Sequence, residues 1–189
     1  MFYGCKNLTA IKIPEKVEEI DLLAFARSGL ESVTFARDSC LKIIKRRAFD
    51  GCLNLSCIDS PVEKIEDKVF ANSGVKSIVF SSDSILRTIE KGAFRSSALE
   101  MIHIPSSVES IEDEAFQDCV QLKSVFIAAD SRLQRIGSCA FEGCSNLQTI
   151  ESPFSTVLDS NVNPPLKYIS LPPIQRSPTG QYEINSQIE

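Results

Sequence analysis

Apolar residues recur along the chain with a period of 21 to 25 residues, which is set by a series of phenylalanines. Five residues before each phenylalanine except the first stands an isoleucine, and three residues earlier stands another aliphatic residue. After each phenylalanine come a cysteine or serine, then a leucine or valine, then an isoleucine or valine. The phenylalanines are Phe2, Phe25, Phe49, Phe70, Phe94, Phe116 and Phe141. Such an internal repeat predicts a solenoid in which each copy forms one coil.

The second half of each copy predicts a β-strand. Its segments follow the pattern L-x-x-I-x-I, and residues 8–13 and 30–35 alternate apolar and polar positions after the first leucine. A period in the low twenties is too short for two packed helices but suits one strand and a short return. We therefore expect a mostly β solenoid with short turns or 3-10 or helical segments, a parallel sheet, and phenylalanine rings stacked in one core.

The copies differ in length at defined places. Copies with a cysteine, such as DGCLNLSCI, have one residue more before the leucine than copies with a serine, such as ANSGVKSI. The joins between copies vary as well, from IPSSVESI to SSDSILRTI. Because insertions are tolerated where the chain runs over the surface, the joins are expected to be surface turns.

Composition narrows the classes of partner. The chain has 189 residues, a net charge of -5 at pH 7 and no basic run, which argues against nucleic acid or an anionic membrane as the main partner. It contains no apolar run of the length that spans a bilayer. The first residues, MFYGCKNLTAIKIP, lack the pattern of a signal peptide, so the sequence as it stands predicts a cytoplasmic protein.

The sequence predicts neither a catalytic residue nor a cofactor or metal site. It has a single histidine, and no glycine-rich loop that would hold a nucleotide. Of the 7 cysteines, Cys5, Cys52, Cys119 and Cys144 occupy the repeat position that other copies fill with serine. This equivalence indicates small groups that pack or form hydrogen bonds within a turn, rather than zinc ligands.

The outward side of the expected sheet carries the candidate binding residues. Outward positions are the second and fourth after each repeat leucine or valine. They place four apolar or aromatic residues on three adjacent strands, with polar residues toward both ends: Val79, Met101, His103 and Phe126. A rimmed apolar patch of this kind predicts a protein-binding surface. The alternatives are that strand propensity alone selects these residues, or that a further part of the protein covers them.

The repeated AF…C…L…I unit resembles the BspA-like subfamily of leucine-rich repeats over residues 1 to about 153. The resemblance implies a right-handed superhelix with a concave parallel sheet and no enzyme activity of its own. It also implies partner binding, either as a cell-surface antigen or adhesin-like fragment, or as an intracellular scaffold or regulatory segment of a larger protein such as a kinase.

Two regions depart from the repeat. The first copy lacks the V-x-x-I half before Phe2, which predicts either a fragment or an edge covered by a partner or a second copy. Residues 1–153 therefore hold six to seven units, the first incomplete. Residues 154–189 contain many of the prolines and are expected to form a partial cap and a flexible tail.

Overall fold

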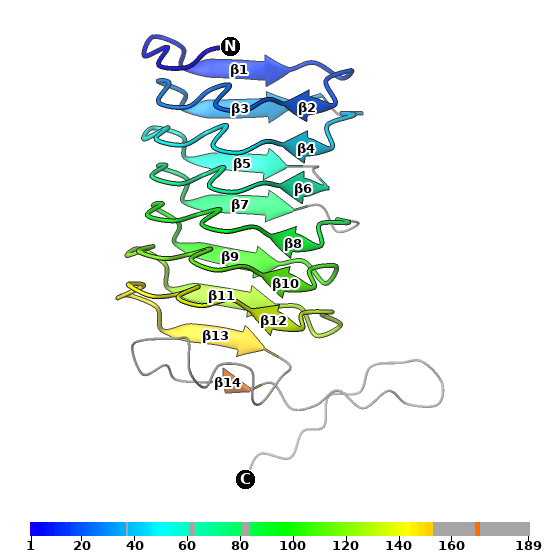
Figure 1. Cartoon of the computed structure of the whole chain (residues 1–189), viewed down its shortest axis with the longest axis vertical. Helices are drawn as coiled ribbons and strands as arrows, with labels where there is room; N and C mark the ends of the chain where they lie inside the picture. Colours follow the sequence, from blue (N-terminus) through cyan, green and yellow to red (C-terminus); the bar gives the residue numbers. More distant parts are fainter. Residues whose placement is uncertain (37, 61–62, 81–83, 153–168, 171–189) are drawn as a thin grey trace.

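The computed structural model describes residues 1–36, 38–60, 63–80, 84–152 and 169–170, and in them the chain winds into a stack of similar coils (Figure 1). Each coil carries one long strand: β1 (Ala10–Ile13), β3 (Ser32–Phe35), β5 (Cys57–Ser60), β7 (Ser77–Phe80), β9 (Met101–Ile104), β11 (Ser124–Ile127) and β13 (Thr149–Ser152). Short strands follow them on the return: β2 (Glu19–Ile20), β4 (Ile43–Ile44), β6 (Lys64–Ile65), β8 (Thr88–Ile89), β10 (Ser110–Ile111) and β12 (Arg135–Ile136). The described residues contain no helix, so the returns are made of turns.

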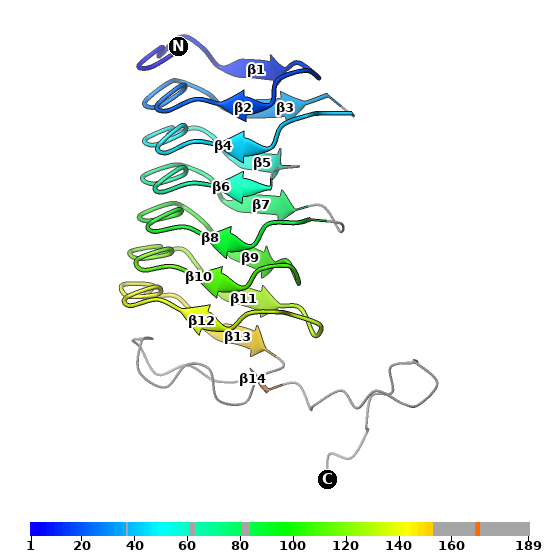
Figure 2. The same cartoon turned by 45° about the vertical axis from the view of Figure 1, so that its right-hand side comes forward.

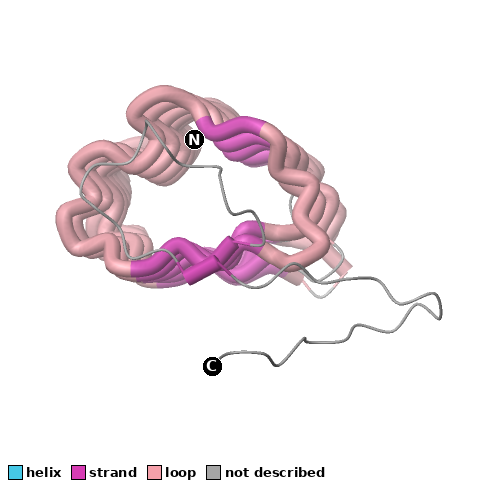
Figure 3. Tube along the Cα trace, turned by 90° about the horizontal axis from the view of Figure 1, so that it is seen from below, coloured by secondary structure: helices cyan, strands magenta, loops and turns pink. Residues whose placement is uncertain are grey.

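All strand pairs among the described residues are parallel, and each strand except β7 pairs with its counterpart in the next coil. The short strands form one sheet in the order β12-β10-β8-β6-β4-β2. The long strands form two ladders, β1-β3-β5-β7 and β9-β11-β13-β14, the last strand being β14 (Ile169–Ser170). Figures 2 and 3 show the long and short strands on opposite sides of each coil. The expected parallel-strand solenoid is confirmed.

The phenylalanine rings form a continuous stack through the core, as the repeat predicts. Neighbouring ring centroids lie 5.1 to 5.6 Å apart, from Phe2 to Phe141. Phe49, Phe70, Phe94 and Phe116 are completely buried. The rings are close to parallel, and the largest interplanar angle, 16°, lies between Phe70 and Phe94. Offset stacking of this kind adds to the burial of apolar area, so each ring holds two coils in register.

A backbone ladder runs beside the ring stack, although no strand forms there. The N–H of Phe49 donates to the carbonyl of Val69 at 3.0 Å, and that of Gly51 donates to Ala71 at 2.9 Å. The residues two before and two after the phenylalanine have left-handed backbones, as at Arg47 (φ 56) and Gly51 (φ 69). A left-handed backbone costs a non-glycine residue about 1–2 kcal/mol, so the lateral hydrogen bonds and the buried ring must offset it.

Two glycines allow a short coil to stack on a long one. A Cβ at Gly29 would lie 1.9 Å from the carbonyl oxygen of Lys6, and one at Gly74 would lie 2.0 Å from that of Leu53. Both glycines belong to serine-containing copies that follow a longer, cysteine-containing copy. The equivalent Ala98 follows a copy that is itself short, and there a side chain is present. Glycine is therefore required where a short coil follows a long one.

The repeat region expected over residues 1–153 forms coils up to Ser152. Of the expected cap and tail over 154–189, the structure describes only β14, which pairs in parallel with β13 through Glu151 and Ile169. The rest of that segment lies outside the described residues, so the expected cap and tail stay predictions.

Replacing Phe94 with alanine is expected to lower the free energy of unfolding by about 3–5 kcal/mol, because it opens a cavity between two coils. The matched control is Phe2→Ala, since Phe2 stacks on one ring only and is 43% exposed. Urea unfolding measures both variants. Equal losses for the two variants would contradict a core in which the central rings contribute most.

Candidate partner-binding face

Side chains along the long strands alternate between the core and the surface. In β9, Ile102 and Ile104 are buried, whereas Met101 and His103 are exposed. β7 shows the same alternation, with Ile78 buried and Val79 exposed. The positions assigned to the outer face from the sequence are therefore on that face.

His103 and Phe126 form the centre of the candidate patch. They are directly opposite each other in the register of β9 and β11, and their rings stack with centroids 4.4 Å apart and planes 11° from parallel. Met101 lies on the same side of β9 and is 49% exposed, and Val79 on β7 is 58% exposed. The structure thus brings these four residues, called the β7–β11 patch below, onto three neighbouring strands.

The long sheet is interrupted within this patch. β7 and β9 lie side by side, but they belong to separate ladders, whereas β6 and β8 of the same coils remain paired through Ile65 and Ile89. The interruption coincides with the largest tilt between successive phenylalanine rings, that of Phe70 and Phe94. A shallow depression of about 270 Å³ lies there, and its lining includes Val79, Phe80, Ser84, His103, Pro105 and Ser106.

Polar groups lie on both sides of the patch along the sheet. On the β13 side, Glu151 stands opposite Phe126, and the hydroxyl of Thr149 donates to that of Ser124 at 3.0 Å. On the other side, one strand beyond the neighbouring β5, the exposed outward residues of β3 are Ser32 and Thr34. An apolar centre with a polar rim is the usual organisation of a protein-binding surface.

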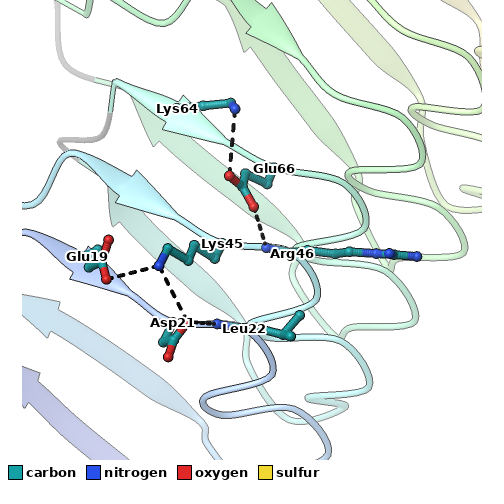
Figure 4. A network of polar contacts seen from close by, with 7 residues as sticks. All are labelled: Glu19, Asp21, Leu22, Lys45, Arg46, Lys64 and Glu66. Atoms are coloured by element: carbon teal, nitrogen blue, oxygen red, sulfur yellow. Dashed lines mark hydrogen bonds and ion pairs between the residues drawn. The ribbon is translucent and has the colours of Figure 1, made fainter.

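The short-strand side of the solenoid differs in character, because its charged residues pair with one another between coils. Figure 4 shows Lys45, whose ammonium lies 3.0 Å from a carboxylate oxygen of Glu19 and 3.6 Å from one of Asp21. In the next coils, Glu66 accepts from the backbone N–H of Arg46 at 3.0 Å and lies 3.6 Å from Lys64. Each exposed pair contributes at most about 1 kcal/mol, but together they give this side a polar, internally matched surface.

Among the cysteines that share a repeat position with serine, Cys5 is exposed, whereas the buried Cys52, Cys119 and Cys144 form hydrogen bonds inside the core. The thiol of Cys52 donates to the carbonyl of Phe25 at 3.0 Å, and that of Cys119 donates to the carbonyl of Phe94 at 2.9 Å. The hydroxyl of Ser73 donates to the carbonyl of Phe70 at 2.7 Å. Burial raises the pKa of the Cys52 thiol. The serine hydroxyl therefore closes the turn after its own phenylalanine, whereas each thiol bonds the phenylalanine carbonyl of the preceding coil. Both are small groups that form hydrogen bonds, as the equivalence of cysteine and serine indicates.

The sequence alone located the patch residues but not two features of their arrangement. The ring stacking of His103 on Phe126 follows from a register that the repeat predicts, and could have been inferred from their equivalent positions. No sequence signal marks the interruption between β7 and β9.

In the described part of the chain, no cluster of three histidine, cysteine or acidic residues is placed to hold a metal ion. No helix among these residues has the length and apolar character needed to cross a bilayer.

These features define a parallel solenoid of short repeats with a display face. The family model for the BspA type leucine rich repeat region matches residues 1–123 and 111–159 in 6 copies, so the chain belongs to this family. Repeats of this family typically serve as non-enzymatic, protein-binding scaffolds. No curated protein sequence matches the chain significantly.

Solved structures of bacterial leucine-rich repeat proteins share the fold. A leucine rich cell surface protein from Faecalibacterium prausnitzii is 28% identical, with a TM-score of 0.66 over 92% of this chain and 44% of its own. A leucine-rich repeat protein from Bacteroides ovatus is 19% identical, with a TM-score of 0.55 over 87% of this chain and 52% of its own. The pneumococcal vaccine antigen PcpA is 22% identical, with a TM-score of 0.52 over 77% of this chain and 53% of its own. The chain thus spans about half the length of each of these structures.

Alkylation of the native protein with iodoacetamide is expected to label Cys5 and Cys40, which are exposed, much faster than Cys52, Cys119 and Cys144, which are buried. Contact with the Cys119 thiol, together with burial, raises the pKa of Cys144, and a thiol with a raised pKa forms less of the reactive thiolate. Mass spectrometry of the digested protein gives the rate at each site. If the buried thiols of the folded protein were labelled at the rate of Cys40, they could not be the buried hydrogen-bonding groups described above.

Proposed function

We propose that this protein is a protein–protein interaction module that binds its partner through the β7–β11 patch, made up of Val79, Met101, His103 and Phe126. The observation that carries the proposal is an apolar and aromatic cluster on one sheet face, in which Val79, Met101 and His103 are exposed and Phe126 is half-buried. On the opposite side of the solenoid, charged side chains form ion pairs between neighbouring coils. That side therefore offers a partner fewer unpaired charged groups.

The scaffold favours binding because it orders the patch in advance. The two ring residues stand between buried neighbours on their own strands, His103 between Ile102 and Ile104, and Phe126 between Val125 and Ile127. The stacked rings of His103 and Phe126 restrict each other's rotamers. A partner therefore loses little binding free energy to ordering of these side chains. Large flat rings at the centre of a polar rim are also the residues that most often dominate interface energetics.

Display on a cell surface is the setting that we propose for this binding. The Faecalibacterium prausnitzii protein, which is 28% identical over nearly all of this chain, is described as a leucine rich cell surface protein. The alternative setting, an intracellular scaffold or a regulatory segment of a larger protein, uses the same face.

We also propose that the module acts without catalysis. His103 is the single histidine of the chain, and it lies on an exposed strand with one ring face against Phe126. In a nucleophile–histidine–acid arrangement, a third group orients the imidazole by a hydrogen bond. Among the described residues, no side chain donates to or accepts from this imidazole. Its surroundings fit a contact residue better than a general base.

The double variant His103→Ala/Phe126→Ala is expected to weaken partner binding at least about tenfold, as the loss of central contact residues does. Its melting temperature should stay close to that of the wild type, because both side chains lie outside the core. The matched control is Lys12→Ala/Thr34→Ala, which changes the same outward positions on β1 and β3, away from the patch.

The measurement has two stages. A partner captured by the wild-type protein is identified and purified, and its dissociation constant is then determined for all three proteins by calorimetry. Unchanged affinity in the patch variant, or an equal loss in the control variant, would remove the β7–β11 patch from consideration.

A further inference from the structure

The ring stack on the outward face of the long strands ends at His103. Its ring lies 4.4 Å from that of Phe126, with the planes 11° from parallel, and the two residues are directly opposite each other in β9 and β11. One face of the imidazole is therefore turned toward Phe126 and the other toward β7. The outward residue of β7 at the same repeat position is Val79, which has no ring. Among the described residues, no ring stacks on this second face of the imidazole.

A depression of about 270 Å³ lies beside the second face of the imidazole, where β7 and β9 belong to separate ladders (Figure 1). Both His103 and Val79 contribute to its lining. Val79 is 58% exposed, and its side chain ends at two methyl groups, so the longer imidazole projects beyond it. The depression is smaller than the roughly 300–1,000 Å³ of a pocket for a whole small molecule. Its size therefore suits a single inserted side chain.

The lining of the depression favours a neutral aromatic side chain with a polar end. Phe80 and Pro105 supply apolar surface, and Ser84 and Ser106 supply hydroxyl groups. A serine hydroxyl both donates and accepts hydrogen bonds, so either serine can bind a phenolic hydroxyl. The described lining residues include no aspartate, glutamate, lysine or arginine, so none of them would pair with an inserted guanidinium. Tyrosine is the side chain that combines a neutral ring with a hydroxyl group at its end.

We propose that this depression is the binding site for a tyrosine side chain of the partner polypeptide. The tyrosine ring stacks on the second face of His103 and rests on Val79, and its hydroxyl forms a hydrogen bond with Ser84 or Ser106. The stack of Phe126 and His103 thereby gains a third ring across the interruption between β7 and β9. This inference rests on the proposed function, because it names the residue type that the β7–β11 patch receives.

The test measures binding of N-acetyl-tyrosinamide by proton NMR of the imidazole. Its signals are unambiguous because His103 is the single histidine of the chain. A ring that stacks on the imidazole moves these signals upfield. Titration of the intact protein at constant pH is expected to give a saturable upfield shift, with a dissociation constant of about 1–10 mM.

Two further probes serve as matched controls. N-acetyl-leucinamide is of similar size but has no ring, and N-acetyl-argininamide carries a planar cation in place of the neutral ring. Both are expected to bind at least tenfold more weakly than the tyrosine probe. An equal affinity for either control, or no saturable shift with the tyrosine probe, would overturn the proposal.

A variant that fills the depression locates the binding. Val79→Phe places a ring of this chain beside the imidazole, so its signals are expected upfield of those of the wild type without any probe. The tyrosine probe should then no longer move them. The matched control is Thr34→Phe, which changes the same outward position on β3 and should bind the probe as the wild type does. Wild-type affinity in Val79→Phe would place the site elsewhere and contradict the proposal.

The double variant Ser84→Ala/Ser106→Ala tests the hydroxyl groups. It is expected to weaken binding of the tyrosine probe about two- to tenfold, as the loss of one hydrogen bond does, and to leave binding of N-acetyl-phenylalaninamide unchanged. Equal losses for the two probes would contradict the choice of tyrosine.

The failure of this inference can be told apart from that of the proposed function. These titrations use no partner, so a negative result removes the tyrosine site and leaves the patch to the measurement on His103→Ala/Phe126→Ala. Full partner affinity in that double variant would instead contradict the proposed function, and with it the assignment of the site to a partner.

Discussion

Stacking of one coil on the next is the interaction on which the rest of this structure depends. No single coil can bury its apolar side chains alone, so rings such as Phe70 and Phe94 reach full burial only between two neighbours. The same contact aligns the lateral hydrogen bonds that stabilise the left-handed residues beside each ring. Where stacking is absent, at the N-terminal end, the core positions are partly exposed.

This constraint separates the scaffold from the surface. The first inward position of every long strand holds isoleucine or valine, because every coil must fit the next. Outward positions are free of that requirement, and they range from Lys12 through Val79 to Glu151. The sheet can therefore carry an apolar centre at His103 and Phe126 without a loss of core packing. Core packing and the character of the exposed face are therefore encoded by different residues of the same strand.

The repeat in the sequence predicted the strands, their parallel order, the ring stack and the outward positions, because each is a consequence of a period that recurs in every copy. It could not predict the interruption between β7 and β9, since a small change of tilt between two coils arises from packing over the whole interface. The paired left-handed residues around each phenylalanine were also missed, because leucine, arginine and lysine occupy them as well as glycine. The role of Gly29 and Gly74 became clear only once the longer coil beneath each was seen.

Amide hydrogen exchange tests the central claim most directly, because it reports how firmly each coil is held by its neighbours. The account predicts that the N–H groups of Phe49, Phe70, Phe94 and Phe116, which donate to the next coil, exchange slowest. Protection should decrease toward Phe2 at the open end. Exchange of the central phenylalanine amides at the rate of an unstructured peptide would contradict a fold that rests on stacked coils.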